Sequence, residues 1–212
     1  MSEIAGDTID TFMRKVETFS SSYVEDWDAW LSTNSSVRPA QLGRILRKWQ
    51  ACRPNRMRRD AASAMHQAPY LDHLLDLATP HIQALSTFDI ADPSALQTAT
   101  YTTALDHLWD VFEQLSYDGR VREGLAGSVG ISKAVMLVTD GRVGPSFDSS
   151  VRTALKVGEI NHRAQWRNAL GIVNADIQKF QRRTGVSFSA AKPSKFASLE
   201  NGRIYDMALG PR

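Results

Sequence analysis

The stretch "SVGISKAVMLVTDGRVGPSFDSSVR", residues 128–152, sets the expectation for the fold. It contains a glycine turn, the apolar run "ISKAVMLV", a loop with two glycines, and Asp148 in front of a further helical pattern. We expect Gly130 to adopt a positive φ in the turn, because glycine has no Cβ to clash there. Together with "RVREGLAG" before it, the stretch predicts helix, turn, helix, loop and helix.

The rest of the chain shows the same helical periodicity. We expect helices at 7–32, interrupted near the serines at 20–22, and at 39–52, 54–67, 69–86, 92–116 and 160–185. Pro39 suits a first helical turn, Asp92 is expected to cap a helix, and Gly185 is expected to end one. The tail after Gly185 reads as mixed loop with one short helix or strand. The sequence predicts an all-α, two-lobed helical bundle in a single domain, residues 1–212.

Composition restricts the class of protein. Cys52 is the only cysteine, so an internal disulfide and a cysteine-ligated metal cluster are excluded. The N-terminal residues lack the apolar core of a signal peptide, and no apolar run reaches membrane-spanning length. We therefore expect a cytoplasmic monomer that is not bound to a membrane.

Charge is strongly segregated, although the net charge is only +2. Residues 38–59 carry eight Lys or Arg and no acidic residue, whereas residues 60–119 carry nine acidic residues and no Lys or Arg. Residues 120–212 carry fifteen basic and seven acidic residues. Two basic blocks that border one groove would attract a polyanion such as DNA. The alternative is that these charges only solvate helix faces.

The start of the "ISKAVMLV" helix is a candidate phosphate site. The first amides of a helix have no intrahelical acceptor and sit at the positive end of its dipole. We expect the amides of Val129, Gly130 and Ile131 to bind a backbone phosphate. Such contacts position nucleic acid without reading its sequence.

These residues resemble the helix–hairpin–helix DNA glycosylase superfamily, in particular its 8-oxoguanine-glycosylase-like branch. "LAGSVGISKA" is similar to the hairpin (about 119–140), and "SFDSSVRTAL" to the catalytic-aspartate segment (about 144–157). Ala126 and Ser128 replace the usual proline and first glycine of the hairpin. Ser132 occupies the position of the lysine found in bifunctional members, and Lys133 follows it.

The resemblance implies that the chain flips a damaged or modified base out of duplex DNA and cleaves its glycosidic bond. Asp148 would stabilise the positive charge that develops on the sugar and activate a water molecule. As a helix cap it would accept backbone hydrogen bonds from Ser150 or Val151. Lys133 is a candidate Schiff-base nucleophile, which would add lyase activity. The alternatives are that Asp148 only caps a helix and that Lys133 binds a phosphate or solvent.

The remaining candidate residues follow from charge and aromatic character. Trp49 and Phe147 are candidates for the base pocket, with core packing as the alternative. Candidate DNA-binding side chains are Arg47, Lys48, Arg53, Arg142 and Arg152, the last of which has pairing with Asp148 as its alternative role. The histidines lack metal-ligand spacing, and one cysteine cannot hold an iron–sulfur cluster, so no metal or other cofactor is expected.

Two other functions stay open from the sequence. The altered hairpin and the shifted lysine fit a non-catalytic DNA-binding protein that retains the glycosylase fold. The acidic block at 60–119 fits a helical protein-interaction domain, in which that block would form the interface.

Overall fold

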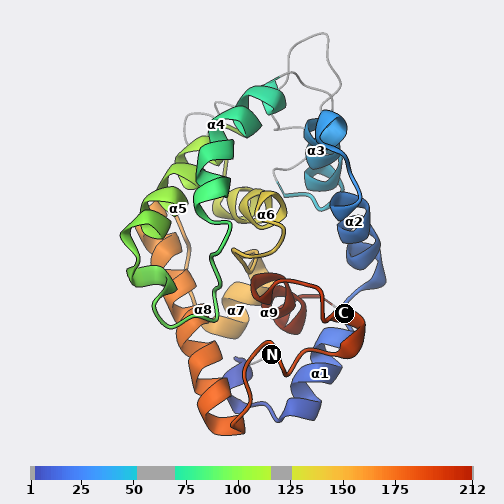
Figure 1. The fold of residues 1–212 in the computed structure, drawn as a ribbon, viewed down its shortest axis with the longest axis vertical. Helices are drawn as coiled ribbons and strands as arrows, with labels where there is room; N and C mark the ends of the chain where they lie inside the picture. The colour runs from blue at the N-terminus through green and yellow to red at the C-terminus, as the bar shows by residue number, and fades with distance from the viewer. Residues whose placement is uncertain (1–2, 52–69, 116–125, 212) are drawn as a thin grey trace.

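A computed structural model of the chain describes residues 3–51, 70–115 and 126–211, and within these ranges all regular structure is helical (Figure 1). The predicted all-α class is therefore confirmed. The α-helices are α1 (Ile9–Glu17), α2 (Ser21–Leu31), α3 (Arg38–Lys48), α4 (Tyr70–Ala84), α5 (Ala99–Phe112), α6 (Ser128–Val138), α7 (Ser149–Leu155), α8 (Arg163–Thr184) and α9 (Asn201–Leu209). In the described part of the chain, no helix is both long and apolar enough to cross a bilayer.

Local sequence explains several helix ends. The predicted break near the serines falls at 18–20, where Ser20 precedes α2, and Pro39 lies in the first turn of α3, as predicted. Gly185 ends α8 with a φ of 71°, a left-handed conformation that glycine adopts without strain. Thr8 caps α1 by accepting a hydrogen bond from the Thr11 amide.

Helices α6 and α9 lie at the centre of the molecule (Figure 1). Helices α4, α5 and α8 lie on one side of them in this view, and α1, α2 and α3 lie on the other. Helix α6 contacts both α3 and α5, whereas α9 contacts α1 and α7. Every residue of α9 is buried, so the C-terminal segment is part of the core.

The loop between α6 and α7 packs backbone to backbone against α9. A Cβ added to Gly202 would lie 2.6 Å from the carbonyl oxygen of Gly141 and 2.7 Å from that of Arg142. The amide of Arg203 donates to the Gly141 oxygen at 2.9 Å. Glycine at position 202 thus allows α9 to approach the loop that leads to Asp148.

Two expectations about local structure are wrong. Gly130 has no positive φ, because α6 begins at Ser128 and includes Gly130 in its first turn. Asp92 does not cap α5, since its carboxylate accepts hydrogen bonds from Ser94 and the helix begins only at Ala99. The short helix expected as one possibility in the tail is present as α9, and all of its residues are buried. The predicted helix at 54–67 and the first half of the hairpin lie outside the described residues.

Candidate functional site

Asp148 occupies the position that the sequence predicts. It is the N-cap of α7, where its Oδ1 accepts a hydrogen bond from the Val151 amide at 3.0 Å. The cap leaves the second carboxylate oxygen without a role in the helix. Asp148 is only partly buried, so this side chain combines a structural bond with access to its surroundings.

Lys133 is buried in α6, with 7 % of its surface exposed. Its Nζ donates to the backbone oxygen of Trp49 at 3.2 Å and lies 6.0 Å from the centre of the Trp49 ring. A buried lysine far from solvent is unusual unless it is paired or functional. The adjacent Ser132 faces the loop before α7, where its Oγ accepts a hydrogen bond from the Phe147 amide at 3.0 Å.

Lys133 and Asp148 line the same cavity, although they belong to different elements. Trp49 and Tyr23 form aromatic walls of this cavity, with ring centres 5.4 Å apart. We call this hollow the amine–carboxylate cavity, and its lining residues are Phe19, Tyr23, Trp49, Lys133, Met136, Ser146, Asp148, Arg203, Asp206 and Pro211. The cavity thus brings an amine, a carboxylate and aromatic surfaces together.

The amine–carboxylate cavity is small. Its volume is about 10 Å³, which is room for no more than one water molecule. A nucleobase therefore cannot enter unless one wall moves. This size is the observation that weighs most against an active enzyme.

Two walls of the cavity differ in how firmly they are held. Trp49 is 5 % exposed, and its indole Nε1 donates to Asp26 at 2.8 Å. Tyr23 is only partly buried, and no hydrogen bond of its hydroxyl is found among the described residues. Burial raises the pKa of Tyr23, and the nearby carboxylates of Asp148 and Asp206 raise it further. Tyr23 is thus the less constrained aromatic wall.

Sequence reasoning missed a buried ion pair at the base of the cavity. Arg203 Nη1 donates to Asp206 Oδ2 at 2.6 Å, and both side chains are almost fully buried. The Arg203 guanidinium also lies 4.6 Å from the centre of the Trp27 ring and 4.9 Å from that of Phe19. Burial raises the pKa of Asp206, whereas Arg203 opposes that shift by favouring the ionised carboxylate. A polar pair at (i, i+3) in an otherwise apolar segment is the only sequence signal that points to it.

The predicted phosphate-binding amides are only partly available. Val129 and Gly130 lie in the first turn of α6, whose amides have no intrahelical acceptor. The amide of Ile131 instead donates to the Gly127 oxygen at 3.1 Å, and the Ile131 side chain is fully buried. Ile131 is therefore not a free donor at this helix start.

The predicted basic side chains do not share one environment. Arg142 contacts Glu200 at 3.5 Å, and Lys48 forms an ion pair with Asp26 at 2.7 Å. Arg47 is exposed on α3, whereas Arg53 lies outside the described residues. Arg152 is partly buried, and no ion pair with Asp148 occurs in the part of the chain that the structure describes.

Phe147, the second candidate for the base pocket, is fully buried and does not line the amine–carboxylate cavity. Trp109 and Trp166 pack against each other with ring centres 5.6 Å apart, within the core. Of the aromatic residues considered from the sequence, Trp49 alone is placed beside Lys133 and Asp148.

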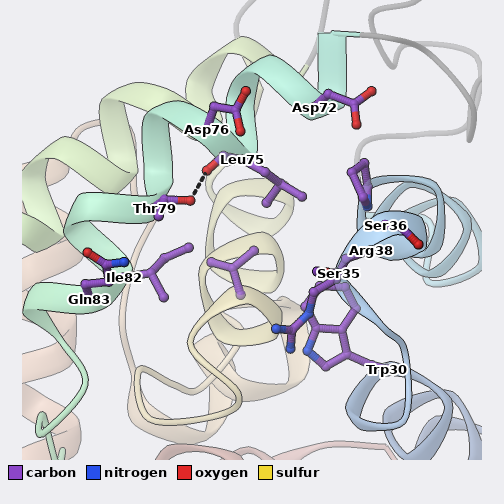
Figure 2. A pocket seen from close by; sticks show the side chains of 12 residues that line it. Trp30, Ser35, Ser36, Arg38, Asp72, Leu75, Asp76, Thr79, Ile82 and Gln83 are labelled. Carbon is purple, nitrogen blue, oxygen red and sulfur yellow. Dashed lines mark hydrogen bonds between the residues drawn. The ribbon is translucent and has the colours of Figure 1, made fainter.

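A larger hollow of about 400 Å³ lies elsewhere on the molecule. Figure 2 shows Asp72 and Asp76 of α4 on one side and Ser35, Arg38 and Trp30 on the other. Arg38 stacks over the Trp30 ring at 4.4 Å and forms an ion pair with Asp140 at 2.6 Å. None of the candidate catalytic residues lines this hollow.

Comparison with protein-family models, curated proteins and solved structures finds no match to this chain. The likeness to the glycosylases therefore depends on the sequence motifs quoted above alone.

Proposed function

We propose that this protein is a DNA glycosylase that uses the amine–carboxylate cavity as its active site. The observation that carries the proposal is the meeting of Lys133 and Asp148 beside Trp49 in one buried cavity. The all-α structure is compatible with the finer arrangement that the resemblance implies, a two-lobed fold with a helix–hairpin–helix. The proposed partner is duplex DNA with a damaged or modified base.

In the proposed reaction, the flipped nucleotide places its glycosidic bond beside Asp148. As the bond to the base breaks, positive charge develops on the sugar ring, and the ionised carboxylate stabilises it. Asp148 also orients a water molecule and accepts its proton as the water oxygen bonds to the sugar carbon. The products are the free base and an abasic site.

Lys133 offers a second route at the same carbon. An unprotonated amine can displace the base and form a Schiff base with the opened sugar, after which elimination breaks the strand. The shared cavity makes this route sterically reasonable, because the amine and the carboxylate face the same space. The two routes differ in one observable, since only the Schiff base is trapped covalently by borohydride.

Opening of the cavity is a requirement of the proposal. Trp49 is tied to Asp26 through its indole and to Lys133 through its backbone oxygen. Tyr23 lacks a comparable tether, so movement of its ring is the route by which a base would reach Asp148. Trp49 would then stay in place as a surface on which the base stacks.

A base-release assay tests the function directly. Duplexes that each carry uracil, an oxidised purine, an alkylated purine or hydroxymethylcytosine are incubated with wild-type protein and with Asp148→Asn. We expect one duplex to lose its base with the wild type and at least a hundredfold more slowly with the variant, as for removal of a key electrostatic group. Asp92→Asn, which alters a distant carboxylate that accepts hydrogen bonds from Ser94, is the matched control and should keep full activity.

The Schiff-base route needs its own assay. An abasic duplex is treated with borohydride and with wild type, Lys133→Ala or Lys179→Ala, a lysine exposed on α8. A covalent adduct with the wild type and Lys179→Ala, but not with Lys133→Ala, assigns the lyase step to Lys133. Base release without any adduct assigns the hydrolytic route.

The small volume of the cavity favours a second candidate, a DNA-binding protein that keeps the fold without catalysis. It predicts duplex binding that weakens steeply with salt, together with no base release from any of the duplexes. Absence of duplex binding at low salt would contradict both candidates and favour a protein-interaction domain.

A further inference from the structure

Asp206 on α9 is bonded to the loop that carries Asp148. Its Oδ1 accepts hydrogen bonds from the Ser146 amide at 3.0 Å and from the Ser146 hydroxyl at 2.7 Å. Its Oδ2 accepts from Arg203 at 2.6 Å, so both carboxylate oxygens are engaged. All three side chains are buried, and Ser146 lies two residues before Asp148.

The same loop is also bonded to α6. The amide of Phe147 donates to Ser132 Oγ, and Ser132 is the residue immediately before Lys133. The backbone just before Asp148 is therefore held from two sides, by α9 through Ser146 and by α6 through Phe147. Between them these bonds fix where the carboxylate lies relative to the Lys133 amine.

We infer that Asp206 is a positioning residue that acts through Ser146 to aim the Asp148 carboxylate into the amine–carboxylate cavity. The effect of this positioning on catalysis rests on the proposed function. The positioning of Asp148 by Asp206 does not depend on that function. The ion pair with Arg203 prevents Asp206 from rotating away, because a charged side chain buried without its partner is costly. Catalysis depends on such placement, since a shift of about 1 Å at a reacting group lowers rates by roughly a hundredfold.

The test weakens the Ser146–Asp206 contact and compares it with a similar bond elsewhere on α9. Ser146→Ala removes the 2.7 Å hydroxyl bond to Asp206. Tyr205→Phe removes a 2.6 Å hydroxyl bond to the buried Asp176, on the same helix but away from the cavity. Both variants lose one hydroxyl that donates to a buried carboxylate, so similar losses of thermal stability are expected.

Two measurements separate positioning from general destabilisation. Single-turnover base release and duplex affinity are measured for wild type, Ser146→Ala and Tyr205→Phe. Amide hydrogen exchange is measured at Phe147 and Val151, which report on the loop and on the Asp148 cap. We expect Ser146→Ala to slow base release about ten- to a hundredfold with unchanged duplex affinity. In Ser146→Ala, hydrogen exchange at the Phe147 and Val151 amides should become faster. Tyr205→Phe should match the wild type both in the rate of base release and in exchange at these two amides.

Each result either supports or overturns the inference that Asp206 positions Asp148. Base release by Ser146→Ala at the wild-type rate would overturn the inference, as would equal slowing in Tyr205→Phe. If the wild type releases no base from any duplex, the proposed function fails and hydrogen exchange alone decides the positioning. In that case, unchanged exchange at Phe147 and Val151 in Ser146→Ala would overturn it, and faster exchange confined to that variant would support it.

Discussion

Replacement of Gly202 by alanine adds only one methyl group, yet it should displace the loop that leads to Asp148 and lower the stability of the protein. Gly202 lies in the first turn of α9 and faces the loop between α6 and α7. A methyl group there would lie 2.6 Å from the Gly141 oxygen, 2.7 Å from the Arg142 oxygen and 2.7 Å from the Gly144 nitrogen. All three are backbone atoms, so no side chain can rotate to make room.

The magnitude follows from two opposed effects. Carbon rarely approaches another heavy atom closer than 3.0 Å without strain, so the loop must move by roughly half an ångström. Overpacking of this kind costs about 1–3 kcal/mol. Alanine is favoured over glycine in a helix by up to about 1 kcal/mol, which offsets part of that cost. We expect a net loss of about 1–2 kcal/mol, equivalent to a melting temperature lower by roughly 2–8 °C for a chain of this length.

The assay is thermal unfolding of Gly202→Ala beside Gly171→Ala. Gly171 lies inside α8, and a methyl group there would meet no atom within 4 Å. The control should therefore gain about 0.5–1 kcal/mol from helix propensity and unfold at a higher temperature than wild type. If Gly202→Ala is as stable as Gly171→Ala, the close approach of α9 to the loop is not present in solution.

Three further predictions concern charged groups. Asp148→Ala should lower the free energy of unfolding by about 1 kcal/mol, whereas Asp148→Asn should leave it unchanged because asparagine also caps helices. Thermal unfolding of the two variants tests this difference. Burial, and to a lesser extent the neighbouring His107, lowers the pKa of His81 below 6.5, so its contribution to stability is complete above pH 6.5 and declines as the pH falls through that value. Acidification below pH 6.5 should therefore lower the melting temperature of the wild type more than that of His81→Gln. Asp206→Asn should cost about 3–5 kcal/mol because it leaves Arg203 buried without its counter-ion, whereas denaturant unfolding should show most of that loss restored when Arg203→Met is added.

Local features of the site could be predicted from the sequence, because they depend on near neighbours. The cap at Asp148 depends on the helical pattern that directly follows it, and the sequence shows that pattern. The direction of Lys133 depends on where α6 lies relative to the loop, which no local pattern reveals. Ser132 stands where the resemblance places a lysine, yet Lys133 is the residue that reaches the cavity.

The buried polar groups of α9 could not be predicted for a different reason. Arg203 and Asp206 are residue types that normally lie on the surface, so the sequence gives no sign that this segment is buried. Burial becomes possible because the two side chains pair with each other and because the rings of Phe19, Trp27 and Trp49 lie around the guanidinium. Such mutual satisfaction depends on tertiary packing, so periodicity alone does not report it.

The polar residues at the cavity are difficult to explain by stability alone. Buried ion pairs seldom stabilise a fold more than apolar residues of the same volume would, because desolvation offsets their attraction. The cavity holds the buried Lys133, the buried Arg203–Asp206 ion pair and the partly buried Asp148, beside the aromatic rings of Tyr23 and Trp49. The core around these polar groups is apolar. A fold selected for stability alone would be expected to replace this cluster, whereas one that needs an amine and a carboxylate out of water would keep it.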